Sequence, residues 1–137
     1  MNELEQFFDR DRFAKRCGIE LVSMAPGHAV ARMKIGPEHL NGYRTVQGGA
    51  IFTLADFAFA AASNAHGTVA VGINVSINFI KAATAGTLQA EARELARNPK
   101  LGTYLVNVTD AQGELVAVFQ GLVYRKSEPV GAALKRP

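Results

Sequence analysis

The stretch Gly48–His66, with the sequence GGAIFTLADFAFAAASNAH, decides the fold of this 137-residue chain. It predicts one long helix over about residues 48–65, with Gly67 at the C-cap position just beyond it. At about 100° per residue, one stripe of this helix consists mostly of small residues, which permits close packing on a sheet: Ile51, Ala55, Ala58 and Ala62.

After this helix the hydrophobic period changes to two. Between residues 69 and 79 apolar side chains alternate with small or polar ones, which predicts a long, half-buried strand. Further strands are expected at 86–97, 102–110 and 114–125, and as a pair within 19–35 that turns at Pro26-Gly27. Short connections favour antiparallel pairing of the strands. A single apolar helix inserted after the second strand then buries its apolar surface best by lying across one face of that sheet. The fold class is therefore α+β, with a helix on a sheet.

The helix carries a single charge, because Asp56 is the only charged residue between Arg44 and Lys81. A carboxylate among apolar neighbours is costly unless it is paired or serves a purpose. One interpretation is structural, in which Asp56 caps a neighbouring loop or meets a backbone amide. The other is a general base or nucleophile with a raised pKa. On the helical wheel Asp56 shares a stripe with three residues: Phe52, Phe59 and Ser63.

Two glycines, Gly48 and Gly49, begin this helix after Gln47. Their N–H groups lack a side chain to shield them, and the helix dipole adds partial positive charge, so this terminus can hold a carbonyl oxygen and stabilise the oxyanion that forms on attack. Gly48 and Asp56 are eight residues apart, or about 12 Å along one helix. A single carbonyl therefore contacts both only if two chains meet with their helices roughly antiparallel, as in a two-fold dimer.

The segment from His39 to Asp56, HLNGYRTVQGGAIFTLAD, resembles the signature of the phenylacetic-acid-degradation (PaaI-like) hotdog thioesterases of the 4-hydroxybenzoyl-CoA thioesterase superfamily. That family has the pattern H-x-N-x-x-G-x-x-H-G-G, followed by an apolar stretch and L-A-D. Later segments also look similar to that family, namely Ala62-Ser63-Asn64, the N-F-I-K-A run at 78–82 and the closing G-x-L-V-A strand. The resemblance covers roughly residues 15–126. It implies a hotdog fold, an antiparallel sheet wrapped around one long central helix.

The resemblance also implies catalytic roles. Asp56 matches the catalytic carboxylate, Gly48 matches the glycine whose N–H polarises the thioester carbonyl, and Asn41 matches the asparagine that positions the loop and the reacting groups. The carboxylate and the glycine then come from different subunits. Gln47 departs from the family, which usually has His at this position; glutamine exchanges hydrogen bonds but does not titrate. Arg44 stands where the family often has Gly.

Candidate substrate contacts surround these positions. Phe52 and Phe59 suggest an apolar pocket for an aryl or medium-length acyl chain, and Gly49 belongs to the same helix terminus. His39 is either a loop residue or part of the site. For the CoA phosphates and ribose we expect basic residues at strand ends and hairpins: Lys81, Arg93, Arg97 and Lys100, with Arg125 and Lys126 as further candidates.

The expected activity is hydrolysis of an acyl-CoA, with CoA as part of the substrate and no separate cofactor or metal. A non-catalytic or degenerate acyl-CoA-binding hotdog protein is the alternative, and Gln47 is its main support. A hotdog hydratase is disfavoured because the nearest following histidine, His66, is ten residues from Asp56 on another face.

The bulk properties limit other functions. The net charge of +3 forms no block of like charges, so nucleic-acid binding is not expected. No secretion signal or membrane span is visible, and one cysteine fits a reducing cytoplasm. We expect one domain over residues 1–126, with a helix within 1–16, a flexible tail at 127–137, and assembly as a homodimer or a dimer of dimers.

Overall fold

The computed structural model describes all of residues 1–137. Its elements are, in chain order, α1 (Glu3–Asp9), α2 (Arg12–Arg16), β1 (Ile19–Ala25), β2 (His28–Lys34), a 3-10 turn (Pro37–His39), α3 (Gly48–Asn64), β3 (Thr68–Phe79), β4 (Thr87–Arg97), β5 (Leu101–Thr109), β6 (Leu115–Pro129) and α4 (Val130–Ala133).

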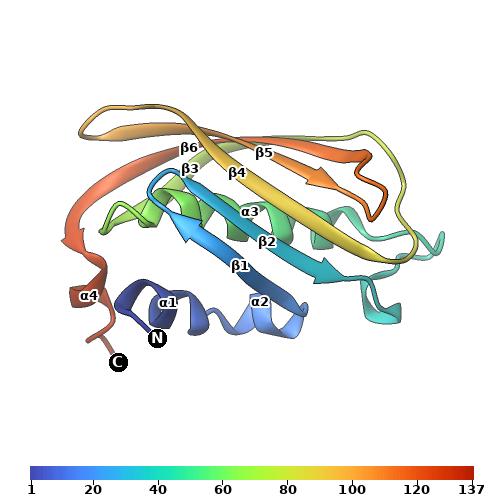
Figure 1. Ribbon diagram of the computed structural model, residues 1–137, viewed down its shortest axis with the longest axis horizontal. Coiled ribbons are helices and arrows are strands. Elements are labelled where there is room, and N and C mark those ends of the chain that lie inside the picture. Colours follow the sequence, from blue (N-terminus) through green and yellow to red (C-terminus); the bar gives the residue numbers. More distant parts are fainter.

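All six strands form one antiparallel sheet in the order β1-β2-β4-β5-β6-β3. The sheet curves around α3, which lies along its inner face, while α1, α2 and α4 lie on the far side of that helix (Figure 1). The predicted α+β arrangement of one long helix on an antiparallel sheet is confirmed. Strands β1 and β3 are the two edges of the sheet.

The small stripe of α3 packs as predicted. Ala55, Ala58 and Ala62 have no exposed surface, and the turn between β1 and β2 comes so close that Gly27 N–H donates to the carbonyl of Ala62 at 3.0 Å. The helix ends at Asn64 with Ala65 as its C-cap, so Gly67, which we had predicted at the C-cap position, lies two residues further on. Gly67 has a φ of +102°, a conformation that glycine adopts without steric cost. The hydrogen bond from Gly27 to Ala62 holds α3 at a fixed position along the sheet.

The N-terminal helix predicted within residues 1–16 is divided in two. Asp11 has an extended backbone, and its carboxylate accepts a hydrogen bond from Ala14 N–H at 2.9 Å, so it begins a second helix. We call α1 and α2 together the N-terminal arm. The ring of Phe8 anchors this arm on Phe57 of α3, with ring centres 5.7 Å apart.

Strand β3 departs from strict alternation. Its pairing with β6 shifts register between Gly72 and Asn74, and this bulge changes which side chains face the core. Val71 and Ile73, before and within the bulge, are 38% and 54% exposed, whereas Val75, after it, packs against the core. Before the bulge Ala70, which is 8% exposed, faces the core instead, so the predicted apolar side of the strand is buried only beyond the bulge.

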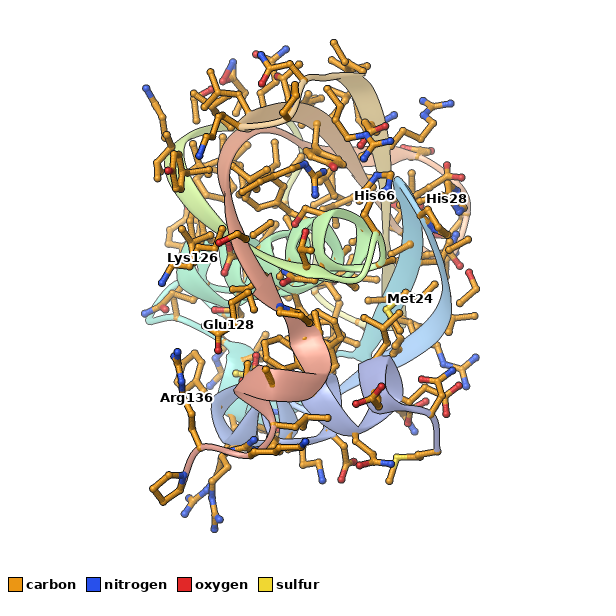
Figure 2. All side chains as sticks on the ribbon, turned by 90° about the vertical axis from the view of Figure 1, so that its left-hand side faces the viewer. Met24, His28, His66, Lys126, Glu128 and Arg136 are labelled. Atoms are coloured by element: carbon orange, nitrogen blue, oxygen red, sulfur yellow. The ribbon has the colours of Figure 1, made fainter.

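The C-terminal segment is packed, so the prediction of a loose tail is wrong for most of it. β6 continues to Pro129, and Val130, which is 2% exposed, donates its N–H to Gly67. The guanidinium of Arg10 then donates to the carbonyls of Leu134 and Arg136. Figure 2 shows β6 passing the end of α3 and reaching α4 beside the N-terminal arm. Burial of the apolar Val130 side chain explains why the chain beyond residue 127 is ordered rather than loose.

Candidate active site

Asp56 lies on the outer face of α3, away from the sheet, and is exposed in the single chain. It shares this face with Gly49, Thr53 and Ala60, and not with Phe59. At about 100° per residue, Phe59 and Ala60 fall on opposite sides of Asp56, so this residue marks the border between the buried and the open faces. The open face that carries Asp56 therefore continues to Ala60, and not to Phe59, which the helical wheel had placed on the same stripe.

The Asp56 carboxylate has no ion pair and accepts no hydrogen bond within the chain, so neither of the structural roles considered for it is present. Although the residue is exposed as a whole, partial burial of its carboxylate raises the pKa above the ordinary value, and the negative charge of Asp11 raises it further. An unpaired carboxylate with a raised pKa is suited to act as a base.

Gly48 is the first residue of α3, and Gln47 is its N-cap. The N–H groups of Gly48 and Gly49 donate to no acceptor in the chain, whereas Ala50 already donates to the carbonyl of Gln47 at 2.9 Å. The ring of Phe79 covers Gly48, since a Cβ there would lie 3.0 Å from its Cζ atom. This terminus therefore has the free donors that an oxyanion requires.

The loop that leads into α3 is held by Asn41. Its Oδ1 accepts from the N–H groups of Tyr43 and Thr45, at 2.9 and 3.2 Å, and its Nδ2 donates to Thr45 Oγ1 at 3.1 Å. Arg44 takes a φ of +64°, a left-handed conformation that glycine adopts more readily than a residue with a side chain. Asn41 therefore fixes the path of the chain into Gly48, but its side chain does not reach the helix terminus itself.

His39 is buried, with both ring nitrogens engaged. Nδ1 accepts from Gly36 N–H at 2.9 Å, so the proton of the neutral ring lies on Nε2, which donates to the carbonyl of Cys17 at 2.6 Å. The ring joins the loop before α3 to the end of α2. Of the two interpretations of His39, the structure favours the loop residue.

Gln47 is exposed, and its side chain makes no capping bond to the helix. Its Oε1 atom lies 2.8 Å from the position that a Cβ on Gly49 would occupy. A side chain at position 49 would displace Gln47, so Gly49 leaves room for the glutamine beside the terminus.

The predicted aromatic contacts separate in the structure. Phe59 is 1% exposed and packs between Tyr104 and Phe119, with ring centres 5.6 and 5.3 Å away, so it belongs to the core. Phe52 is half-buried and also contacts Phe119, with ring centres 5.5 Å apart.

The predicted cationic contacts lie at opposite ends of the sheet (Figure 1). Lys81 follows β3 and is paired with Asp110, at 2.8 Å, and with Glu114. Arg97 and Lys100 flank the hairpin between β4 and β5, near the end of α3, and Arg93 is exposed further along β4. The structure therefore groups Arg97 with Lys100 and separates both from Lys81.

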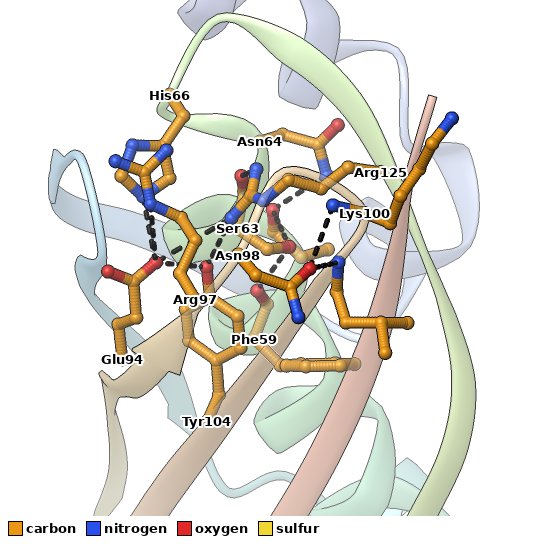
Figure 3. Close-up of polar contacts among 12 residues, drawn as sticks. Phe59, Ser63, Asn64, His66, Glu94, Arg97, Asn98, Lys100, Tyr104 and Arg125 are labelled. Atoms are coloured by element: carbon orange, nitrogen blue, oxygen red, sulfur yellow. Dashed lines mark hydrogen bonds and ion pairs between the residues drawn. The ribbon is translucent and has the colours of Figure 1, made fainter. Parts of the chain in front are cut away.

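A polar cluster at the end of α3 was not predicted from the sequence (Figure 3). Glu94 Oε1 accepts from Tyr104 Oη at 2.7 Å and lies 2.8 Å from Nε2 of His66. Arg125, which is 5% exposed, donates to Tyr104 Oη at 2.8 Å and to the carbonyl of Ser63 at 3.2 Å, and its buried Nε has no partner. Arg125 is therefore a structural residue of this cluster rather than a surface cation.

The cluster sets the protonation states of its members. Burial alone raises the pKa of Glu94, but hydrogen bonds from Tyr104 and His66, with the charges of His66 and Arg97, outweigh it and leave that pKa below its ordinary value. Burial and the bond to Glu94 raise the pKa of Tyr104, which stays protonated. The only sequence signal for this cluster is that charged side chains recur near the strand ends.

Comparisons with known proteins agree with this architecture. Residues 43–117 match the family described as the thioesterase superfamily. Acyl-coenzyme A thioesterase PaaI of Escherichia coli is 37% identical over 119 residues, which are 86% of this chain and 85% of that protein. The solved E. coli PaaI protein, from the phenylacetic acid degradation operon, has a TM-score of 0.88 at 34% identity and covers 93% of this chain and 96% of its own. Protein smu.793 of Streptococcus mutans, solved bound to acetyl-CoA, has a TM-score of 0.77 at 27% identity over 81% of this chain and 90% of its own.

The chain therefore belongs to the thioesterase superfamily. It is a thioesterase with a hotdog fold of the PaaI-like kind, so the predicted resemblance and the predicted fold are both confirmed. No helix of the structure is long and apolar enough to span a membrane. No three His, Cys, Asp or Glu side chains come together as a metal site.

Proposed function

We propose that this protein hydrolyses an aryl- or medium-chain acyl-CoA to the free acid and CoA, with Asp56 as its catalytic carboxylate. The observation that carries the proposal is the unpaired Asp56 carboxylate on the open face of a helix whose first N–H groups are also free. The names of the relatives, an acyl-CoA thioesterase and a protein bound to acetyl-CoA, support this choice of substrate.

The site needs a second copy of the chain. Gly48 and Asp56 lie about 12 Å apart on one continuous helix, too far to act on one carbonyl. The open face of α3 adjoins β3, a twelve-residue edge strand whose apolar Val71 and Ile73 are exposed. Two copies that meet at this edge, related by a two-fold axis perpendicular to α3, would have antiparallel helices, with Gly48 of one copy toward Asp56 of the other.

In this arrangement the thioester carbonyl accepts a hydrogen bond from Gly48 N–H at the positive end of the helix dipole. Asp56 either removes a proton from a water molecule that attacks the carbonyl carbon or attacks that carbon itself. The carbon–sulfur bond then breaks and CoA leaves as the thiolate, which takes up the proton that Asp56 removed from the water. If Asp56 attacks directly, a mixed anhydride forms instead, and a water molecule hydrolyses it to the free acid and the regenerated carboxylate. Asn41 holds the loop that places Gly48, and Gln47 remains beside the terminus as a hydrogen-bonding group that does not titrate.

The remaining contacts follow from what is exposed. Phe52, and not the buried Phe59, supplies aromatic surface near Asp56 for the acyl group. Arg97 and Lys100 are better candidates for the CoA phosphates than Lys81, because two carboxylates already pair with Lys81. Arg93 is a further candidate on the same strand as Arg97.

A non-catalytic acyl-CoA-binding protein is the second candidate, favoured by Gln47 at the position where the family usually has His. Thiol release from a panel of aryl- and straight-chain acyl-CoAs separates the two, with binding of each measured by calorimetry. Turnover by the wild type that is lost in Asp56→Asn, with binding kept, supports hydrolysis. Binding without turnover by the wild type supports the second candidate.

A further inference from the structure

The junction between α1 and α2 lies against the face of α3 that carries Asp56. Phe8 packs its ring on Phe57 before this junction, and Ala14, only 3% exposed, is buried after it. Between these two anchors stands Asp11, which lines a cavity of about 530 Å³ with Ala60 and an adjoining one of about 510 Å³ with Phe57. Phe57 follows Asp56 directly and Ala60 is one turn later, so Asp11 opens onto the surface beside Asp56.

The position of Asp11 is fixed by its own backbone. Its N–H donates to the carbonyl of Phe8 at 3.1 Å, and its Oδ1 accepts from Ala14 N–H at 2.9 Å. An N-cap carboxylate held at both ends of a turn has little freedom to move away from α3.

Neither Asp11 nor Asp56 forms an ion pair with a cation of the chain. Within the arm, Arg10 donates to carbonyls of the C-terminal segment and Lys15 pairs with Asp9 at 2.8 Å, whereas Arg12 and Arg16 are exposed and form no ion pair. The other charged side chains that line the larger cavity are a pair, Glu128 with Arg136 at 2.7 Å, and Lys126. Asp11 is the one whose charge acts on Asp56.

We propose that Asp11 is a positioning residue for catalysis, whose fixed negative charge acts on the Asp56 carboxylate from the N-terminal arm of the same chain. A neighbouring negative charge disfavours the ionised form of Asp56 and makes it a stronger proton acceptor near neutral pH. The raised pKa of Asp56, due first to burial and then to Asp11, agrees with this geometry. The catalytic consequence depends on the proposed role of Asp56, but the charge coupling does not.

Asp11→Asn is the decisive variant, because asparagine caps a helix as well as aspartate does and keeps the acceptor for Ala14 N–H. Asp9→Asn is its matched control, since it removes one negative charge from the same arm at a residue whose partner is Lys15. Both full-length variants are compared with the wild type by two readouts. One is the ¹³C NMR titration of the Asp56 carboxyl, assigned by its loss in Asp56→Asn, and the other is the pH dependence of kcat/KM.

In Asp11→Asn the Asp56 titration should move to lower pH, and the acid limb of kcat/KM should move with it. Activity on that limb, relative to the plateau, should rise about two- to fivefold, the range expected of one unit charge whose field is partly screened by water. The shift should shrink at high salt and be absent in Asp9→Asn. An unchanged Asp56 titration, or an equal shift in Asp9→Asn, overturns the proposal. A shifted titration with an unshifted rate profile would instead mean that Asp11 acts on Asp56 and that Asp56 is not the catalytic base.

Discussion

Gly48 and Asp56 lie on one unbroken helix, with Gly48 at its first position and Asp56 two turns later on its exposed face. The same helix therefore offers an oxyanion donor at its end and a carboxylate about 12 Å along it. Neither group has a partner within the chain. Both are placed for a substrate that lies between two copies of this surface.

The first prediction concerns the charge of Asp56. Asp56→Asn keeps the shape of the side chain but removes the base or nucleophile, so kcat should fall by about 10² or more. Thiol release measures the rate, and circular dichroism checks the fold. Thr53→Val, which alters the same face of α3 without removing a charge, is the control and should stay within a few-fold of the wild type. Equal activity in Asp56→Asn would remove this residue from the mechanism.

The second prediction concerns Gln47. Because glutamine does not titrate, the wild-type profile of kcat/KM against pH should lack a histidine limb near the usual pKa of about 6.5 and should follow a carboxylate. Gln47→His should introduce such a limb. A wild-type limb near neutrality that disappears in His39→Gln would contradict this, although His39 is buried and bonded through both ring nitrogens.

The parts of the site that the sequence predicts are local ones. The Gly-Gly start of α3, its single charge and its small stripe are all properties of neighbouring residues, and the structure confirms the helix from Gly48 to Asn64. The separation between Gly48 and Asp56 follows from helix geometry alone, so it too was predictable. Local patterns therefore predict α3, the free N–H groups at its start and the carboxylate of Asp56 two turns later.

Features that depend on distant contacts were not predictable. The bulge at Gly72–Asn74 changes the face of β3 and has no signal in an alternating pattern. Asp11 approaches α3 only because Phe8 packs on Phe57, 49 residues further along. The helical wheel also could not say on which side of Asp56 the sheet would lie, which is why Phe59 proved to be in the core.

The third prediction concerns the polar cluster at the end of α3 (Figure 3). Glu94→Gln removes the charge that His66 and Tyr104 contact, and should lower the free energy of unfolding at pH 7 by about 1–3 kcal/mol. The control is Glu91→Gln, whose carboxylate meets His28 at the same 2.8 Å but is 43% exposed, against 22% for Glu94. Exposed pairs contribute about 1 kcal/mol or less, so the control should change little.

The pH dependence of this difference has a defined sign. The pKa of Glu94 is lower in the folded protein than its ordinary value of about 4.3, so its contribution is present above that pH and is lost as the pH falls through the folded value. Urea unfolding of wild type and Glu94→Gln should therefore converge as the pH falls below about 4. A difference that grows on acidification would contradict the role of the ionised carboxylate.

The last prediction concerns the shared site and uses two variants that damage different halves of it. Asp56→Ala removes the carboxylate. Gly48→Pro removes the N–H at the first helical position, where proline is tolerated, and Gln47 already has the extended ψ of 139° that a following proline requires. Gly48→Ala is the matched control, because it adds a Cβ near Phe79 but keeps the N–H, and it should retain most of the activity.

Each variant alone should be nearly inactive, since both of its sites carry the lesion. In a mixed dimer, one site carries both lesions and the other carries neither. Random exchange makes about half of the dimers mixed, each with one intact site of two, so activity should recover to roughly a quarter of the wild-type value. If Gly48 and Asp56 acted within one chain, every site would hold one lesion and mixing would restore nothing. Absence of recovery, with subunit exchange verified by native mass spectrometry, would therefore exclude a site built from two chains.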